Sequence, residues 1–250
     1  MPDPLEPSNV ISTLYDSGRY AELRDYCNMR LEKDPAEMLA LENCATACLH
    51  LGLYEEALAH CRSVLERERG DTYALRNAIY ALENLHRYGE VLECCGEMLE
   101  ADPRDIWTLN SAGLALAEMG RDAAAAEYFE RSLKLDPHNT TALMNGALSL
   151  GRTGQVRQSI SYYDTALRLD PSLREAAEAR ARAYRSLGME DEAFLAAQGI
   201  RDGDMGRIIR QARRNRCSLL HQLCLEEMDR YRDADPHADN PFRPDGRAHT

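Results

Sequence analysis

Apolar residues recur along the chain with a period longer than one helix. Leucine stands every 34 residues at four places, Leu41, Leu75, Leu109 and Leu143. Two helical turns further on, a second apolar position carries Leu14, Cys48, Leu82, Leu116, Leu150 and Tyr184. Within each period the apolar residues keep helical spacing. The pattern therefore predicts an all-α protein built from repeated pairs of amphipathic helices.

Glycines and Asp-Pro pairs divide each period into two helices. Glycine is expected to end the first helix at Gly18, Gly52, Gly120, Gly154 and Gly188, with His86 as the exception, because glycine readily adopts the left-handed conformation of a helix C-cap. The second helix is expected to end at Asp34, Asp102, Asp136 and Asp170, because a residue before proline avoids the helical region. Small residues such as Gly113 and Ala125 are expected to let paired helices approach closely.

The glycines and the Asp-Pro pairs divide the chain into six repeats. Their predicted bounds are 4–37, 38–71, 72–105, 106–139, 140–173 and 174–203. The second repeat has Arg69 in place of the proline. The sixth has Met205 there and Arg180 where a small apolar residue is usual. We expect that last repeat to be irregular, with Gly199 ending its second helix early.

With these features the chain resembles the tetratricopeptide repeat family over roughly residues 4–200, and most closely from Trp107 through Phe129 to Pro137. The resemblance implies a right-handed superhelical solenoid of about six helix pairs, whose first helices line a concave groove. It also implies a scaffold or adaptor that binds other proteins. The sequence holds no glycine-rich phosphate loop, nucleophile elbow or two-histidine metal helix. We therefore expect no enzyme activity and no cofactor.

One predicted groove position carries side-chain amides in four repeats. Its occupants in the first five repeats are Asn9, Asn43, Asn77, Ser111 and Asn145. Asparagine in the middle of a helix costs up to about 0.7 kcal/mol relative to alanine, yet its amide can pair with both the N–H and the C=O of a bound peptide. We predict that this ladder binds an extended peptide of about a dozen residues. The alternative, that the amides bond neighbouring helices or water, stays open.

Other predicted groove positions supply possible anchors for the peptide. They carry Tyr73, Arg76, Tyr80 and Trp107, and aromatic residues and arginine often dominate the energetics of interfaces. Tyr73 and Trp107 could instead pack between repeats.

Some members of the family bind the C-terminal carboxylate of chaperones through lysine and arginine around a groove asparagine. Around Asn43 the corresponding positions hold Ser8, Ser12, Tyr73 and Asn77. The sequence therefore disfavours this carboxylate-clamp binding.

Charge and cysteine usage limit the partners and the compartment. The net charge is −12 and the sequence pI about 5.1, which disfavours nucleic acid and anionic membranes as partners. The N-terminal segment does not resemble a secretory signal, and no apolar stretch approaches the about 20 residues of a membrane span. With eight cysteines in a long chain, we expect free thiols in a reducing cytoplasm.

Five cysteines occupy positions that face between helices. They are Cys27, Cys44, Cys48, Cys61 and Cys95. We expect them to be small buried hydrophobic residues and to bind no metal. Because Cys44 and Cys48 stand one helical turn apart and His60 neighbours Cys61, a metal or redox site remains the alternative.

The C-terminal part is expected to finish the array. Residues 204–232 predict one capping helix, and residues 233–250 a disordered tail. One face of that helix carries Arg207, Arg210, Arg213, Arg214 and Arg216. The arginines are either a solvated face or a docking patch, and in the second case the chain would be a structural subunit that docks through its convex face or this basic helix. The tail contains Asn240-Pro241-Phe242, which resembles a short motif bound by EH domains.

Overall fold

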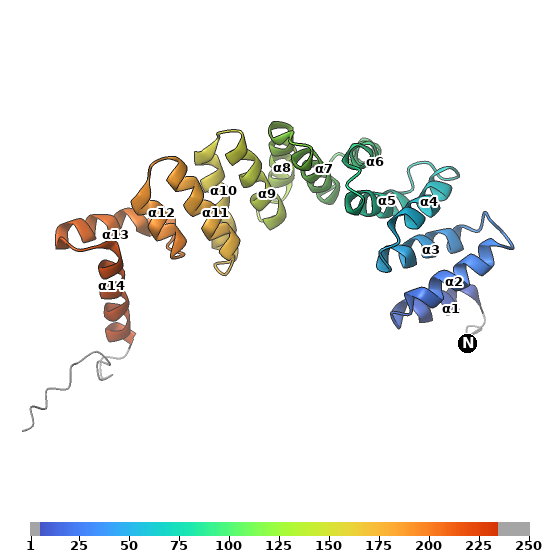
Figure 1. Ribbon diagram of the computed structural model, residues 1–250, viewed down its shortest axis with the longest axis horizontal. Coiled ribbons are helices and arrows are strands. Elements are labelled where there is room, and N and C mark those ends of the chain that lie inside the picture. The colour runs from blue at the N-terminus through green and yellow to red at the C-terminus, as the bar shows by residue number, and fades with distance from the viewer. Residues whose placement is uncertain (1–5, 235–250) are drawn as a thin grey trace, which may run out of the picture. The chain divides into compact units, whose positions relative to one another are not determined.

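The computed structural model describes residues 6–234, which form helices and no strands. The chain divides into two compact units, residues 1–169 and 170–250. The described part of the first unit holds the helices of the first five predicted repeats (Figure 1). Their bounds are α1 (Pro7–Asp16), α2 (Tyr20–Leu31), α3 (Met38–His50), α4 (Tyr54–Leu65), α5 (Thr72–Asn84), α6 (Tyr88–Ala101), α7 (Ile106–Glu118), α8 (Asp122–Leu135), α9 (Thr140–Arg152) and α10 (Val156–Leu169). The residues before Glu6 and the predicted tail after Ala234, with its Asn240-Pro241-Phe242 motif, lie outside the described residues.

The helices of the first unit pack in the order of the chain. Each helix lies against its neighbours in sequence, so that α3, for example, packs between α2 and α4 (Figure 1). The first helices of successive repeats also touch one another, α3 with α5 and α7 with α9. The odd-numbered helices therefore lie in one layer and the even-numbered helices in another.

Left-handed residues end the first helices, as the sequence predicts. The φ angles of Gly18, Gly52, Gly120 and Gly154 lie between 70° and 82°. In the third repeat His86 occupies the same place and has φ 56°. The chain therefore makes the same turn at a residue whose Cβ disfavours it.

The aspartate of each Asp-Pro pair has a bonding role besides stopping the helix. Its carboxylate accepts a hydrogen bond from the backbone N–H two residues on. The four bonds are Ala36 N to Asp34 Oδ1 at 3.0 Å, Arg104 N to Asp102 Oδ1 at 2.9 Å, His138 N to Asp136 Oδ1 at 2.9 Å and Ser172 N to Asp170 Oδ1 at 2.8 Å. Each such bond closes a tight turn around the proline and satisfies an amide just before the next helix.

The two helices of the fourth repeat pack closely at a glycine. A Cβ atom added to Gly113 on α7 would stand 2.8 Å from Cε1 of Phe129 on α8. Phe129 is fully buried, so its ring cannot move out of the way. This confirms that a small residue at this position lets the paired helices approach closely.

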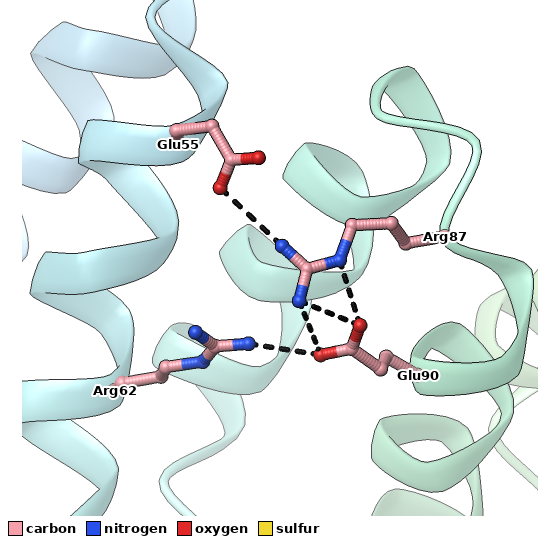
Figure 2. A network of polar contacts seen from close by, with 4 residues as sticks. All are labelled: Glu55, Arg62, Arg87 and Glu90. Carbon is pink, nitrogen blue, oxygen red and sulfur yellow. Dashed lines mark hydrogen bonds and ion pairs between the residues drawn. The ribbon is translucent and has the colours of Figure 1, made fainter.

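A network of ion pairs links the second helices of repeats 2 and 3 (Figure 2). Arg87, at the start of α6, bonds Glu90 through Nε at 2.7 Å and contacts Glu55 of α4 at 3.3 Å. Arg62 of α4 reaches the same Glu90 at 2.8 Å. The network ties one repeat to the next on the layer of second helices, with Arg87 and Glu90 partly buried and Arg62 and Glu55 exposed.

The described part of the second unit contains four helices. They are α11 (Arg174–Ser186), α12 (Glu190–Ala197), α13 (Asp202–Asn215) and α14 (Leu219–Ala234). As predicted, α12 is short and is followed by Gly199 with φ 75°. The large side chain of Arg180 is buried here, and its Nη2 donates to the carbonyl oxygen of Ile200 at 2.7 Å. Arg180 thus fastens the loop that follows the shortened helix.

The expectation of one capping helix over 204–232 was wrong in one respect. Two helices occupy the segment, because α13 stops at Asn215 and Arg216 adopts the left-handed conformation with φ 51°. A conformation of this kind at a non-glycine residue is rare and is not visible in the helical spacing of apolar residues. Within the described residues, no helix is both long enough and apolar enough to cross a membrane.

We expect Gly113→Ala to destabilise the protein although alanine is the better helix former. The gain in helix propensity is about 1 kcal/mol, whereas overpacking against Phe129 costs about 1–3 kcal/mol. The matched control is Gly96→Ala on α6, where an added Cβ meets nothing within 4 Å, so that only the gain remains. Urea unfolding of both variants measures the difference, and equal stabilisation by both would contradict the close approach.

We expect His86→Gly to stabilise the protein by about 0.5–1 kcal/mol. It removes the left-handed penalty of about 1–2 kcal/mol, of which the extra flexibility of glycine in the unfolded chain takes back about 0.5–1 kcal/mol. The reciprocal variant Gly120→His places a side chain at φ 72° and should lower the melting temperature. A fall in melting temperature for His86→Gly would show that its 2.8 Å hydrogen bond to the Tyr88 hydroxyl outweighs the strain.

Candidate functional site

The first unit has a surface cavity of about 720 Å³ over its first three repeats. The first helices α1, α3 and α5 and the start of α4 supply its walls. Its lining includes Tyr15, Thr46, Leu49, His50, Tyr54, Tyr73, Asn77 and Tyr80. Most of these residues stand at the positions that the family resemblance assigns to the groove.

The cavity gathers exposed aromatic side chains. The exposed fractions are 40% for Tyr15, 48% for Tyr73 and 49% for Tyr80, although large aromatic residues are usually buried. The Tyr54 ring meets Tyr80 edge to face with centroids 6.4 Å apart. The Tyr73 hydroxyl lies 2.7 Å from Oγ1 of Thr46 on α3. Each of the two α5 tyrosines thus contacts a neighbouring helix and still remains about half exposed.

Asn77 lines this cavity and carries a hydrogen-bond donor without a partner. The residue is half-buried, and its Nδ2 is shielded from solvent without a hydrogen-bond partner. An amide donor in this state forgoes about 1–3 kcal/mol of hydrogen bonding, so buried polar atoms of this kind are rare. A rotation of the amide that brings this N–H group to the surface of the cavity would let it donate to an acceptor of a ligand.

The other members of the predicted ladder do not line the cavity. Nδ2 of Asn43 donates to the carbonyl oxygen of Leu39 in its own helix at 2.7 Å. Ser111 is buried on α7. Asn9 lies half-buried on α1 and Asn145 half-buried on α9. The recurring asparagines thus have different surroundings, and a uniform ladder stays a prediction.

Arg76 and Trp107 form a pair across α5 and α7. The guanidinium carbon lies 5.0 Å from the centre of the indole ring, and Nη2 lies 3.1 Å from Oδ2 of Asp105 at the start of α7. The Trp107 ring is 36% exposed. The arrangement ties repeat 3 to repeat 4, which is the packing role that the sequence left open for Trp107.

Tyr15, His50 and Tyr54 were missed by the sequence analysis. Tyr15 and His50 occupy groove positions near the ends of α1 and α3. Their aromatic character was the signal by which the sequence could have identified them. The rings of Tyr15 and His50 meet edge to face at 5.8 Å, and Tyr20 stacks on His50 at 4.0 Å. Tyr54 begins a second helix, so no register of first-helix positions would have selected it.

Two carboxyl groups on the first helices have raised pKa values. Burial raises the pKa of Glu83, and a hydrogen bond from Ser111 partly opposes this rise. Burial also raises the pKa of Glu42, with Asp71 and Glu68 adding to the effect. Oε1 of Glu83 is shielded from solvent without a hydrogen-bond partner. The negative charge of Glu83 is therefore poorly stabilised in the folded protein.

One group of side chains could hold a metal ion. Cys44, Cys48 and His60 bring one donor atom each to within 4.8 Å of one another. Hydrogen bonding to Cys44 and burial raise the pKa of the Cys48 thiol, while burial lowers the pKa of His60 and favours the neutral imidazole that binds metals. Among the described residues, the other buried thiols belong to no such group of three metal-binding side chains. Burial raises the pKa of Cys61 and of Cys95 to about 12.

The arginine face of α13 in the second unit is partly neutralised. Arg207 pairs with Glu226 at 3.1 Å and Arg213 with Asp191 at 3.1 Å. All five of the predicted arginines are exposed: Arg207, Arg210, Arg213, Arg214 and Arg216. The pairs show that at least part of this face is a surface ion-pair network.

Comparisons with known proteins agree on the class. Two tetratricopeptide repeat models match residues 107–139 and 144–207. No curated protein matches the chain in sequence. The chain is therefore a tetratricopeptide repeat protein, built as an all-α repeat solenoid.

Solved structures of similar fold belong to the same class. One is MamA from Desulfovibrio magneticus RS-1, with 20% identity, a TM-score of 0.62 and coverage of 71% of this chain and 97% of that one. A second crystal structure of MamA has 14% identity and a TM-score of 0.62 over 82% of this chain and 98% of that one. A third is YrrB, described as a TPR protein with an unusual peptide-binding site, with 18% identity, a TM-score of 0.60 and coverage of 69% and 89%. Identities this low establish the shared fold and nothing finer.

We expect Glu83→Gln to stabilise the protein at neutral pH. The folded pKa of Glu83 lies above its unfolded value, so its ionisation costs stability as pH rises through the window between the two values. Below the unfolded pKa the carboxyl is protonated in both states and the difference disappears. Thermal unfolding of both proteins across acidic and neutral pH measures this, and equal pH profiles would contradict it.

Proposed function

We propose that this chain is a non-catalytic scaffold that holds an extended peptide segment of a partner protein over the first helices of repeats 1–3. The observation that carries the proposal is the cavity in which Tyr73 and Tyr80 are exposed beside the unpartnered Nδ2 of Asn77. YrrB, a similar structure, is described as having a peptide-binding site, which supports the same type of function.

The two kinds of group in the cavity perform different tasks. Tyrosine rings supply large contact area at little entropic cost, because each has only two rotatable side-chain bonds. The Asn77 amide can donate to a carbonyl oxygen of the peptide, and this contact recognises the main chain of the peptide whatever its side chains are. A ligand of this site is therefore expected to place an apolar or aromatic side chain between the tyrosines and one backbone carbonyl near Asn77.

The amide ladder enters this proposal in a modified form. Among the asparagines of the predicted ladder, Asn77 has a buried Nδ2 without a hydrogen-bond partner, whereas Nδ2 of Asn43 donates to the carbonyl oxygen of Leu39. Asn9, Ser111 and Asn145 would extend the contact only if the peptide runs beyond the cavity. With few hydrogen bonds of about 0.5–1.5 kcal/mol each and two aromatic anchors, we expect affinity near micromolar, about 8 kcal/mol.

The partner's surface chemistry follows from charge. A chain of net charge −12 with the half-buried carboxyl groups of Glu42 and Glu83 on its first helices favours a neutral or basic peptide over an acidic one. Binding of chaperone C-terminal carboxylates stays disfavoured, because Ser8, Ser12 and Tyr73 occupy the flanking positions.

The test uses a random peptide display library selected on the full chain, followed by affinity measurement with the selected peptides. We expect Tyr80→Ala to weaken binding by about 30-fold or more, as for an aromatic hot spot of about 2 kcal/mol. Asn77→Ala should weaken it by about two- to tenfold, the effect of one hydrogen bond.

Two matched variants keep the test specific. Asn43→Ala removes an amide of the same ladder whose donor is already bonded, and Met119→Ala removes an exposed apolar side chain outside the cavity. Both should change affinity less than twofold. If Arg210→Ala with Arg214→Ala abolished binding while Tyr80→Ala did not, docking through the basic helix would replace the groove as the site.

A further inference from the structure

Repeat 2 carries an unusual set of side chains between its two helices. Cys44 and Cys48 lie one turn apart on the buried face of α3, and His60 lies on the facing helix α4. One donor atom of each lies within 4.8 Å of the other two. The ligand atoms of a tetrahedral zinc ion with about 2.3 Å bonds to sulfur and about 2.0–2.1 Å bonds to nitrogen stand about 3.5–3.8 Å apart. Closing the cluster on an ion therefore needs side-chain movements of about 1 Å.

The repeat itself provides the comparison that marks these residues as exceptional. At the place of Cys44 the next two repeats have Ala78 and Ala112, and at the place of Cys48 they have Leu82 and Leu116. His60 corresponds to a tyrosine in three of the other repeats, Tyr26, Tyr128 and Tyr162. The fold thus needs only a small apolar residue, a leucine and an aromatic ring at these places. Three metal-binding side chains replace them together, in one repeat.

Oxygen atoms complete the surroundings of the two thiols. Oε2 of Glu56, one turn before His60 on α4, lies 3.4 Å from Sγ of Cys48. Oδ1 of Asn28 on α2 lies 3.2 Å from Sγ of Cys44. Glu56 is exposed and stands outside the three-donor cluster, so a change in its side-chain rotamer is needed for it to supply a fourth ligand atom. Rotation of the Asn28 amide would turn its N–H2 group toward Cys44, where it could donate to a thiolate, as outer partners of metal ligands do.

We propose that Cys44, Cys48 and His60 bind a zinc ion, with the Glu56 carboxylate as the fourth ligand. Two sulfur atoms and one imidazole nitrogen select a soft cation such as Zn²⁺ over Mg²⁺ or Ca²⁺. Binding replaces the two thiol protons by Zn–S bonds, the protons pass to solvent, and no electron is transferred. With four protein ligands the site is closed and structural.

The ion would fasten α3 to α4 beneath the candidate peptide site. Thr46 and Leu49, which line the cavity, stand on α3 between and beside the two cysteine ligands. The metal would therefore hold the helix that supports one wall of the cavity. Because the ion lies on the opposite, buried face of α3, its binding can be tested whether or not a peptide binds above it.

The experiment uses the full chain, purified under anaerobic reducing conditions, stripped with a chelator and titrated with Co²⁺. We expect one Co²⁺ per chain, with a thiolate-to-cobalt charge-transfer band that added Zn²⁺ removes. Cys44→Ala, Cys48→Leu and His60→Tyr each restore the residue that other repeats use, so these variants should fold. Each should weaken Co²⁺ binding by more than the about 10–100-fold typical of losing an outer partner.

The matched control is Cys61→Ala, which removes a neighbouring buried thiol outside the cluster. It should keep both the band and the affinity. Circular dichroism checks that each variant retains its helices. Absence of the band in the unmodified chain would overturn the proposal. So would a Co²⁺ affinity of the His60→Tyr and Cys48→Leu variants equal to that of the unmodified chain. A band lost only in Cys61→Ala would place the metal elsewhere and overturn it as well.

Discussion

Burial of one apolar face against the next helix is the interaction on which this protein depends. The helices of the first unit are 10 to 14 residues long, and isolated helices of that length are marginal in water. Each gains stability only by packing against its neighbours, most closely where Gly113 admits the ring of Phe129. A repeat solenoid results because every helix pair leaves an apolar face that the next helix pair has to cover.

The same requirement divides the surface into two kinds. The second helices of repeats 2 and 3 are joined by the ion pairs Arg87–Glu55 and Arg62–Glu90. Ion pairs at partly exposed positions such as these contribute modest energy. First helices touch one another directly, α3 with α5 and α7 with α9. Outward side chains add contacts between repeats, such as Tyr73 with Thr46, without having to be buried. Tyr73 and Tyr80 remain about half exposed, so this layer leaves aromatic surface open to a ligand.

The features that the sequence predicts well are those determined by local backbone chemistry. The left-handed glycines and the Asp-Pro turns depend on one or two residues each, so they can be predicted from the sequence alone. Side-chain partners depend on the neighbouring repeat. Asn43 and Asn77 share a register, yet one bonds its own helix and the other faces a cavity. In the second unit the left-handed Arg216 divided a segment whose apolar spacing reads as one helix.

Register has a second use, because it separates what the fold requires from what it merely permits. A position that is leucine or alanine in several repeats and cysteine in one has been filled with chemistry that packing does not need. By that criterion Cys44 and Cys48 stand apart from Cys61, whose position is also cysteine in the neighbouring repeats at Cys27 and Cys95. Those three buried thiols act as small apolar side chains. Only in repeat 2 do two further thiols meet an imidazole, on the same helix that supports the tyrosine cavity, so the two proposed sites share one structural element and no side chain.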